Sequence, residues 1–399
     1  MSTGLANRAG WIKPSATLEL VAKVRALLAQ GRPVVRFDAG EPDFSTPGRI
    51  VRAAEKAMED GKTGYTAASG IVELKDAICR VMDREYGIDV SIGNVIVSSG
   101  AKQSLFNAVS MLFQEGDEVI LLSPFWVSYP AMVGFNGAKV VVVSDPAGGL
   151  LPRLEQVERS ITSSTRGIIL NNPNNPSGVV MSHEYMEGLS RLVMEHDLWA
   201  ISDEIYSKLV FEKAFKSFVS LDPRLKERTI TINGVSKTYA MTGWRIGFAI
   251  GPEEVISRMA ALQSQSTSNP CTISQWAAVE ALTGPQDDVR EMTNEFKARR
   301  NELVELLNRL PGIRCPMPDG AFYALPDFSA YLEREIDGTK ISSDQDLAAY
   351  FLESYMVAVV PGSAFGADGR LRFSYTCDRE KIKEGVARIS AALERLGYA

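Results

Sequence analysis

Histidine is scarce in this sequence of 399 residues. Its two histidines, His183 and His196, stand among polar residues in a stretch that predicts a helix and its end. We interpret both as surface residues, so no metal site is expected, and nucleophiles that are activated by histidine are nearly excluded. An enzyme with this sequence would therefore transfer protons with a carboxylate, a tyrosine or a lysine.

Cysteine pairs, long apolar runs and excess positive charge are also lacking. The four cysteines contain no C-x-x-C pair, so we expect free thiols in a reducing cytosol. No apolar run has the length of a membrane helix, and residues 1–15 lack the apolar core of a signal peptide, so a cytoplasmic location without a membrane is expected. The net charge of -6 argues against a nucleic-acid partner, which would require a basic face.

What the sequence does contain, from about residue 90 onward, is a series of short apolar runs alternating with helical patterns. Such runs predict an α/β fold with a mostly parallel seven-stranded sheet that is sandwiched by helices. Ligands of such sheets bind at the carboxyl ends of the strands. The runs are Val95–Ser98, Glu118–Leu122, Lys139–Val143, Gly167–Leu170, Leu198–Ser202, Thr229–Asn233 and Arg245–Ile250.

The sequence on either side of this region indicates a second, smaller α+β domain. An amphipathic helical stripe and a short strand at Val34–Phe37 precede the region. A long helical pattern after Pro285, three strand-like runs and a final amphipathic helix follow it. We expect an N-terminal segment of residues 1–47 that joins the small domain, a large domain of residues 48–290 and the small domain at residues 291–399.

Two of the runs lead into segments with unusual backbone requirements. The small residues of Ser99–Gln103 open a helix, whose free N–H groups and positive dipole end attract an anion. The segment Asn171–Gly178 contains two Asn-Pro steps, which make a rigid loop because each proline fixes its own φ and restricts the preceding residue. A simple surface turn would not require such rigidity, so the second segment favours a functional role.

Two other runs end close to an acid and an amine. Asp203 follows an apolar run directly, where a carboxylate is costly unless it has a partner, and Tyr206 comes soon after. Lys237 follows another run, and burial there would lower the pKa of its amine and make it nucleophilic. Each feature has an ordinary explanation alone, such as a loop cap or a lysine that extends into solvent. Together they give one sheet edge the groups that pyridoxal phosphate requires.

At this point the sequence resembles the class I aminotransferases of fold type I, specifically the bacterial aspartate aminotransferase subgroup. The resemblance extends over essentially the whole chain, and eight motifs occur in the family's order. They are KPSAT at Lys13–Thr17, AGEPDF at Ala39–Phe44, SGAKQ at Ser99–Gln103, WVSYP at Trp126–Pro130, NNPNNPSG at Asn171–Gly178, SDEIY at Ser202–Tyr206, SKTYAMTGWRIG at Ser236–Gly247 and RFSY at Arg372–Tyr375.

The resemblance implies a pyridoxal 5'-phosphate enzyme whose catalytic residues are Lys237, Asp203 and Tyr206. Lys237 would hold the cofactor as a Schiff base and carry the proton of the substrate α-carbon. Asp203 would pair with the pyridine nitrogen, and Tyr206 would donate to the ring oxygen. The residues implied to hold the cofactor are Lys237, Gly100, Ala101, Lys102, Trp126, Asn175, Asp203, Tyr206, Ser236, Arg245 and, from the neighbouring subunit of a homodimer, Tyr65.

The resemblance also implies the reaction and its substrates. An acidic amino acid, aspartate first and glutamate as partner, would exchange its amino group with 2-oxoglutarate or oxaloacetate by a ping-pong mechanism. Arg372 would bind the α-carboxylate with two parallel hydrogen bonds, and Lys102 is the candidate for the second carboxylate. The residues implied to bind the substrate are Gly40, Trp126, Asn175, Arg372, Lys102, Ser15, Thr17 and Lys13.

Several alternative functions remain. Prephenate and aromatic amino acids stay open as substrates, and a lyase that uses the same fold and cofactor is a second alternative. A nicotinamide dehydrogenase is disfavoured because no G-x-G-x-x-G follows a strand. A P-loop hydrolase is disfavoured because Lys56 stands where Gly61-Lys62-Thr63 would need a preceding glycine. A regulator built on this fold would need a DNA-binding module, for which there is no room before residue 12.

Overall fold

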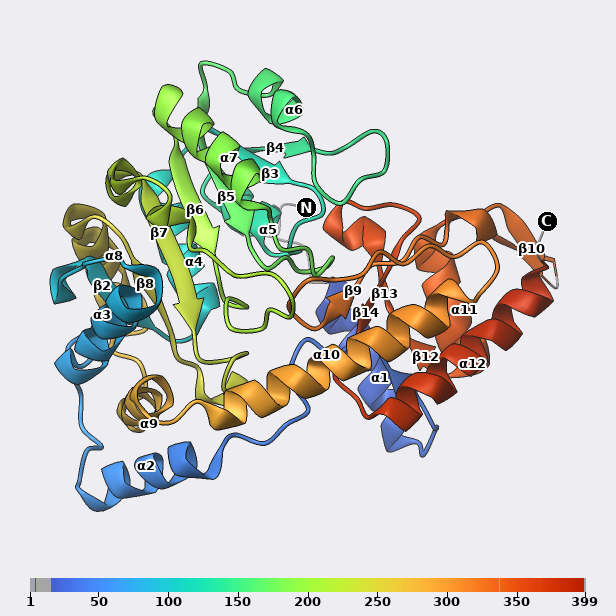
Figure 1. Cartoon of the computed structure of the whole chain (residues 1–399), viewed down its shortest axis with the longest axis horizontal. Helices are drawn as coiled ribbons and strands as arrows, with labels where there is room; N and C mark the ends of the chain where they lie inside the picture. Colours follow the sequence, from blue (N-terminus) through green and yellow to red (C-terminus); the bar gives the residue numbers. More distant parts are fainter. Residues whose placement is uncertain (1–3, 5–15, 337, 398–399) are drawn as a thin grey trace.

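The computed structural model of this protein describes residue 4, residues 16–336 and residues 338–397. The chain forms a larger layered part and a smaller part beside it, and the long helix α10 (Asp287–Asn308) runs from one to the other (Figure 1). The expected domain boundary at residue 290 falls inside this helix, and the division into three segments stays a prediction.

A seven-stranded sheet forms the centre of the larger part, in the order β2-β8-β7-β6-β5-β3-β4. Every neighbouring pair is parallel except the two that involve β8, which confirms the predicted mostly parallel sheet. The strands are β2 (Val95–Ser98), β3 (Glu118–Leu122), β4 (Lys139–Val143), β5 (Thr165–Asn171), β6 (Trp199–Asp203), β7 (Thr229–Gly234) and β8 (Gly247–Ile250).

The central strands are apolar on both faces because helices cover both sides of the sheet. Successive side chains of a strand point to opposite faces. Thus Ile168 and Leu170 of β5 belong to one hydrophobic core, while Ile169 between them belongs to another. The first core includes α2 (Gly48–Glu59), α3 (Val72–Tyr86), α6 (Leu154–Arg159), α7 (His183–Glu195) and α9 (Thr272–Thr283), and the second includes α4 (Ala101–Leu112), α5 (Tyr129–Phe135) and α8 (Glu253–Ser266).

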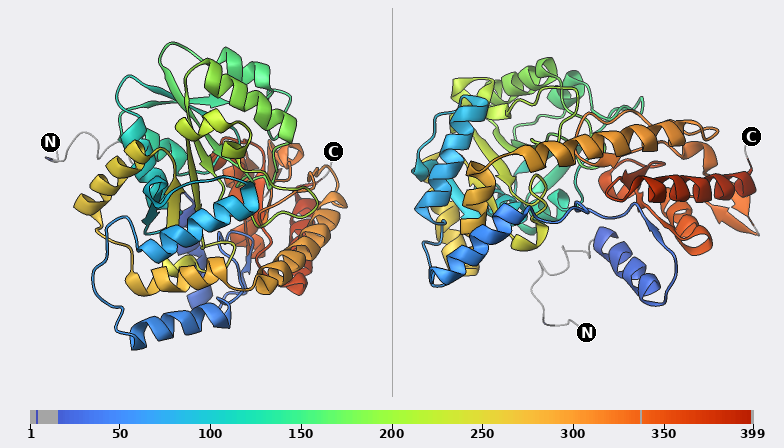
Figure 2. Two further views of the ribbon diagram at one scale, coloured as in Figure 1. Left: turned by 60° about the vertical axis from the view of Figure 1, so that its left-hand side comes forward. Right: turned by 60° about the horizontal axis from the view of Figure 1, so that its bottom comes forward.

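The smaller part has its own core, to which the N-terminal segment contributes. Val35 pairs in parallel with Val357, and Phe37 packs against Phe373 with 5.2 Å between the ring centroids. Helix α1 lies beside this part in the right-hand view of Figure 2, and its Val24 packs with Leu352 and Ala358. The elements are α1 (Ala16–Ala29), β1 (Val35–Arg36), β9 (Tyr323–Ala324), β10 (Arg334–Ile336), β11 (Thr339–Ile341), α11 (Asp344–Tyr355), β12 (Val357–Ala358), β13 (Val360–Pro361), β14 (Leu371–Ser374) and α12 (Arg379–Leu396).

This arrangement determines where the polar segments of the sequence meet. The parallel strands β5, β6 and β7 end at Asn171, Asp203 and Gly234, so the segments that follow them lie at the same edge of the sheet. All four cysteines are unpaired, as expected. Among the described residues, no helix combines the length and the apolar character that crossing a membrane requires.

Candidate active site

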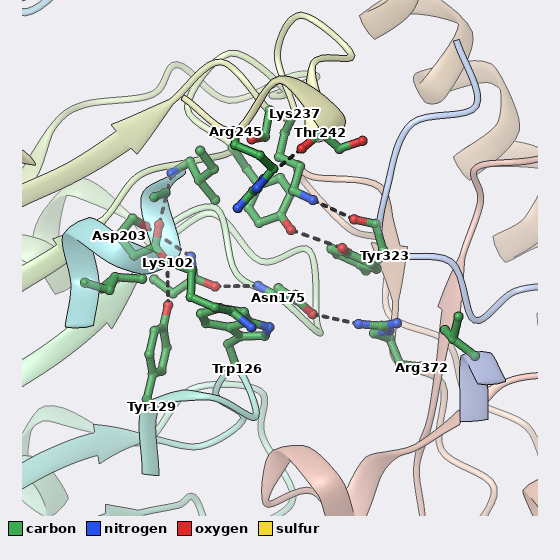
Figure 3. Close-up of a pocket in the computed structure, with 18 of the residues that line it drawn as sticks. Lys102, Trp126, Tyr129, Asn175, Asp203, Lys237, Thr242, Arg245, Tyr323 and Arg372 are labelled. Carbon is green, nitrogen blue, oxygen red and sulfur yellow. Dashed lines mark hydrogen bonds between the residues drawn. The ribbon is translucent and has the colours of Figure 1, made fainter. Parts of the chain in front are cut away.

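A cavity of about 340 Å³ lies at the carboxyl ends of β5, β6 and β7, where the smaller part faces the sheet (Figure 3). It is the place that the fold predicts for a ligand. Its walls come from nine separate stretches of the chain. The lining residues are Val21, Asp38, Gly40, Ala101, Lys102, Leu105, Trp126, Tyr129, Asn171, Asn175, Asp203, Ile205, Tyr206, Ser236, Lys237, Thr242, Arg245, Tyr323 and Arg372.

Asp203 places a buried carboxylate at the floor of the cavity. Its Oδ2 accepts a hydrogen bond of 2.7 Å from the Tyr129 hydroxyl, and its Oδ1 accepts one of 3.3 Å from the backbone N–H of Ile205. Burial raises the pKa of Asp203 to about 6, although the Tyr129 hydrogen bond acts in the opposite direction. Two hydrogen bonds leave acceptor capacity on the carboxylate, so a cationic N–H donor in the cavity would complete its coordination.

Lys237 places an amine in the same cavity. Its Nζ donates a hydrogen bond of 2.6 Å to the carbonyl oxygen of Gly40. Burial lowers the pKa of Lys237 to about 8, and the carboxylate of Glu41 opposes part of this shift. A lysine whose pKa is lowered in this way is neutral at a pH where an ordinary lysine is almost fully protonated, and the neutral amine is the nucleophile.

An anion site is formed where the amino end of α4 meets Arg245. The first N–H groups of a helix have no partner within the helix and carry a partial positive charge. Arg245 adopts a left-handed backbone conformation with φ of 57°, which costs about 1 kcal/mol for a residue with a side chain. Its guanidinium donates to the carbonyl of Thr242 at 2.7 Å and to the carbonyl of Ser99 at 3.4 Å.

Two glycines allow these groups to come this close together. A Cβ on Gly100, whose φ is +88°, would lie 2.3 Å from a guanidinium nitrogen of Arg245. A Cβ on Gly247 would lie 2.0 Å from the backbone nitrogen of Ala101. The first glycine makes room for the cation, and the second lets strand β8 pass directly beneath the first turn of α4.

Arg372 supplies a buried cation on the side of the smaller part. It donates to the carbonyl of Asp38 at 2.9 Å and to the amide oxygen of Asn175 at 3.3 Å. Because arginine can only donate, Asn175 must present its oxygen here, which directs its NH₂ group to other acceptors. The Nε of Arg372 has no hydrogen-bond partner in the part of the chain that the structure describes. Burial lowers the pKa of this guanidinium.

Aromatic rings surround these polar groups. The Lys102 amine lies 4.6 Å from the centroid of the Trp126 ring, and partial burial together with the charge of Arg245 lowers the pKa of Lys102. The hydroxyls of Tyr206 and Tyr323 are 3.0 Å apart. These rings give the cavity apolar walls between its charged groups, as is typical of sites for small organic ligands.

The structure brings most of the residues singled out from the sequence into this one cavity. They are Gly40, Ala101, Lys102, Trp126, Asn175, Asp203, Tyr206, Ser236, Lys237, Arg245 and Arg372. Gly100 adjoins them beside Arg245, whereas the side chain of Tyr65 is 94% exposed and is not part of the cavity wall. Lys13 and Ser15 lie outside the described residues, and so does the side chain of Thr17.

Sequence reasoning missed several residues of the site. Tyr129 lies within the WVSYP motif, so its role as the partner of Asp203 had a signal that was not used. Asp38 and Tyr323 had no such signal, because the hydrogen bonds that join them to Arg372 and to Tyr206 span 334 and 117 positions of the chain. Thr242 contributes through its carbonyl and through a hydroxyl that donates to Glu41 at 2.7 Å.

Comparison with known proteins gives a consistent result over the whole chain. The model of the family described as aminotransferase class I and II matches residues 32–389. The aspartate/prephenate aminotransferase of Cereibacter sphaeroides is 44% identical over 384 residues, which are 95% of this chain and 96% of that protein. The aspartate aminotransferase of Rhizobium meliloti is 42% identical over 98% of this chain and 96% of its own length.

Solved structures of similar proteins have the same fold. The crystal structure of the aspartate aminotransferase from Rhizobium meliloti has a TM-score of 0.94 at 42% identity and covers 99% of this chain and 100% of its own. The aspartate aminotransferase from Thermus thermophilus with maleate has a TM-score of 0.92 at 43% identity, covering 97% of this chain and 99% of its own. The predicted architecture of fold type I is thereby confirmed.

The lowered pKa of Lys237 predicts its reactivity in protein freed of bound small molecules. Formaldehyde with cyanoborohydride methylates neutral amines, so methylation of Lys237 is expected to rise with pH and to reach half of its maximal rate near pH 8. An ordinary lysine reaches that point about two pH units higher. Peptide mapping by mass spectrometry, with a free lysine peptide as the reference, measures both profiles. A Lys237 profile that coincides with the reference would contradict the prediction.

Proposed function

The chain belongs to the aminotransferase class I and II family, and from this premise we propose that it transfers the amino group of aspartate or glutamate to a 2-oxo acid, with pyridoxal phosphate as its cofactor. The observation that carries the proposal is that one cavity contains the amine of Lys237, the carboxylate of Asp203 and two separate anion sites, at Arg245 and at Arg372. One anion site serves a phosphate and the other serves a carboxylate.

The residues of the cavity fit this cofactor. The amino end of α4, Ser236 and Arg245 would hold the phosphate, in the space that the absent side chain of Gly100 leaves. Asp203 has acceptor capacity for a protonated ring nitrogen, and Lys237 is the amine for the aldehyde. When bound, pyridoxal phosphate supplies a ring that accepts the electrons released when the substrate α-carbon loses its proton.

The protein's own groups would hold the ring and move the proton. Asp203, whose carboxylate is buried at the cavity, would keep a positive charge on the ring nitrogen favourable. Tyr206 and the NH₂ group of Asn175 face the cavity as donors to the ring oxygen, and Trp126 presents an aromatic face. Lys237 accepts the proton of the substrate α-carbon at Nζ, which its lowered pKa favours near neutral pH.

Arg372 would fix the direction of the α-carbon by binding the substrate α-carboxylate. Its Nε is buried without a protein partner, so an incoming carboxylate would satisfy that group as well as add charge. Gly40, whose carbonyl now accepts from Lys237, lies on the same wall. The backbone N–H of Gly40 can donate a hydrogen bond to the substrate α-carboxylate once the Lys237 amine has left the Gly40 carbonyl.

Lys102 is the remaining cation for a second carboxylate. Arg245 is assigned to the phosphate and Arg372 to the α-carboxylate, while the Lys102 amine lies over Trp126 at the cavity wall (Figure 3). The Thermus thermophilus relative was solved with maleate, which is a dicarboxylate. We keep the proposal that the second carboxylate is also bound by Lys13, Ser15 and Thr17. Val21, which belongs to the same N-terminal segment, lines the cavity.

Prephenate is the second candidate substrate. The Cereibacter sphaeroides relative is an aspartate/prephenate aminotransferase, and prephenate also carries two carboxylates. The ring of Trp126 provides an apolar surface for a cyclic substrate. A lyase that uses the same fold and cofactor remains an alternative on chemical grounds. Localisation in the cytoplasm stays a prediction from the sequence.

We further propose a homodimer with shared active sites. Tyr65 extends into solvent from the loop between α2 and α3, and Met58 and Val72 near it are 49% and 60% exposed. Exposed apolar side chains of this kind are typical of an interface. A two-fold partner would bury them and would bring its Tyr65 to the phosphate of this chain.

The proposed reaction predicts a visible change of bound cofactor. Purified protein is expected to take up pyridoxal phosphate, and aspartate alone should shift its absorption band, which 2-oxoglutarate should restore. Lys237→Ala should lose at least a hundredfold in transamination, because a positioned base alone contributes about 10²-fold to 10⁴-fold. Stopped-flow absorption measures the half-reactions. Near-normal turnover of Lys237→Ala, or release of ammonia or carbon dioxide instead of amino transfer, would refute the proposal.

The assignment of Lys102 predicts selective loss of acidic substrates. Lys102→Ala should lower kcat/KM for aspartate and glutamate by about tenfold or more, as expected for the loss of one ionic hydrogen bond of 1.5–3 kcal/mol. The values for alanine and phenylalanine should change little. Lys139→Ala, which removes a lysine 73% exposed on β4, is the matched control. Equal losses for acidic and neutral substrates would assign Lys102 to the cofactor instead.

The shared site predicts complementation between two variants that are each impaired in a different residue of the site. Tyr65→Ala should weaken cofactor binding, and Lys237→Ala lacks the essential amine. In a mixed dimer, the Lys237 of one subunit meets the Tyr65 of the other, so mixing and refolding the two variants should restore activity. Sedimentation should show that the active species is a dimer. An active monomer at assay concentration, or no recovery in a mixed dimer, would contradict the shared site.

A further inference from the structure

Tyr323 contacts two of the groups that the proposed function requires, although no motif of the sequence contains it. It lies at the start of β9 in the smaller part and is 1% exposed. Its hydroxyl is 3.0 Å from that of Tyr206, and the two rings meet edge to face with 5.7 Å between their centroids. Figure 3 shows Tyr323 at the cavity wall on the side of Arg372.

The direction of the hydrogen bond between the two hydroxyls follows from proton counting. A tyrosine hydroxyl has one proton to donate and can accept a hydrogen bond as well. If Tyr206 donates its proton to the ring oxygen of the cofactor, its own oxygen can only accept from Tyr323. A hydroxyl that accepts a hydrogen bond becomes a stronger donor, because neighbouring hydrogen bonds polarise one another. Tyr323 would thus strengthen the hydrogen bond that Tyr206 donates to the ring oxygen of the cofactor.

The aromatic ring of Tyr323 has a second contact. The guanidinium carbon of Arg372 lies 4.6 Å from its centroid, and 5.1 Å from that of Phe365. A cation near the face of an aromatic ring is attracted by the ring quadrupole, most strongly where water is excluded. The strand pairing fixes this contact, since Tyr323 is in register with Ser374 on β14, the strand that carries Arg372.

We propose that Tyr323 is a positioning residue that sets the donor strength of Tyr206 with its hydroxyl and the place of Arg372 with its ring. The inference rests on the proposed function, in which these two groups hold the cofactor and the substrate α-carboxylate. Through one side chain, the smaller part thereby contributes to both binding events. The hydroxyl and the ring can be removed separately, so the two roles are separately testable.

The first test removes only the hydroxyl. In holoenzyme, the Lys237 nitrogen would carry the cofactor, and a hydrogen bond from Tyr206 to the ring oxygen would lower the pH at which that nitrogen loses its proton. Tyr323→Phe should weaken the hydrogen bond from Tyr206 and move the pH midpoint of the cofactor absorption band upward by about half to one pH unit, as expected for one hydrogen bond. Tyr331→Phe is the control, because Tyr331 is another buried tyrosine, whose hydroxyl donates to the Pro311 carbonyl away from the cavity.

The same substitution in a Tyr206→Phe background shows whether the effect passes through Tyr206. If it does, Tyr323→Phe should cause no additional shift there. An unchanged midpoint in the single variant, or an equal shift in both backgrounds, would overturn the role of the hydroxyl. If the wild-type protein takes up no pyridoxal phosphate, the proposed function itself fails and the inference fails with it. By contrast, if the wild-type protein binds the cofactor and Tyr323→Phe leaves the midpoint of its titration unchanged, only the inference about Tyr323 fails.

The second test removes the ring. Tyr323→Leu should weaken the binding of succinate to the holoenzyme about tenfold more than Tyr323→Phe does, as expected for a desolvated cation–π contact. The melting temperature of each variant shows that the fold is retained. Equal dissociation constants for the Phe and Leu variants would exclude a role of the ring in positioning Arg372, even if the absorption midpoint shifts.

Discussion

Two opposite charges are buried in one cavity without forming an ion pair, and the other features of the site depend on this constraint. Asp203 is 4% exposed and Arg372 is 3% exposed, yet neither forms a salt bridge with any residue that the structure describes. A buried charge without a partner costs several kcal/mol, and hydrogen bonds return only part of that cost. Tyr129 supplies such a bond to Asp203, while the carbonyl of Asp38 and two aromatic rings support Arg372. The remaining deficit favours ligands that bring a cationic group to Asp203 and an anionic group to Arg372.

The segment from Asp38 to Glu41 connects this requirement to both parts of the molecule. The carbonyl of Asp38 holds Arg372, the carbonyl of Gly40 holds Lys237, and the Glu41 carboxylate accepts from Thr242 beside Arg245. The Asp38 side chain is itself fixed by two hydrogen bonds from Arg36 on β1, at 3.0 and 2.9 Å. A short stretch of backbone outside the helices and strands thus sets the distance between the guanidinium of Arg372 and the amine of Lys237. This precision matters, because an error of about 1 Å in such geometry can cost a hundredfold in rate.

Much of the fold was predictable from the sequence because burial on both faces of a sheet leaves a strong signal. The seven apolar runs correspond to β2–β8 within a few residues, and the largest differences are at β5, which begins at Thr165 rather than Gly167, and at β8, which begins at Gly247 rather than Arg245. The shift at β8 has a physical reason: Arg245 leaves the extended conformation for a φ of 57°, which brings its guanidinium to the amino end of α4. The approach of Arg245 to α4 overrides the strand pattern there.

The sequence by itself determined which chemistry is available, and only the tertiary structure decided how its groups meet. Lys237, Asp203 and the segment at Ser99–Gln103 are recognisable because each follows an apolar strand of a parallel sheet, and such strands end at one edge. Contacts that cross from the smaller part carry no local signal. Tyr323 reaches Tyr206 across 117 positions, and Arg372 reaches Asn175 across 197, so only the packing of the two parts could reveal them. The pKa values of Asp203 and Lys237 belong to the same category, because burial is a property of the folded chain and of no single motif.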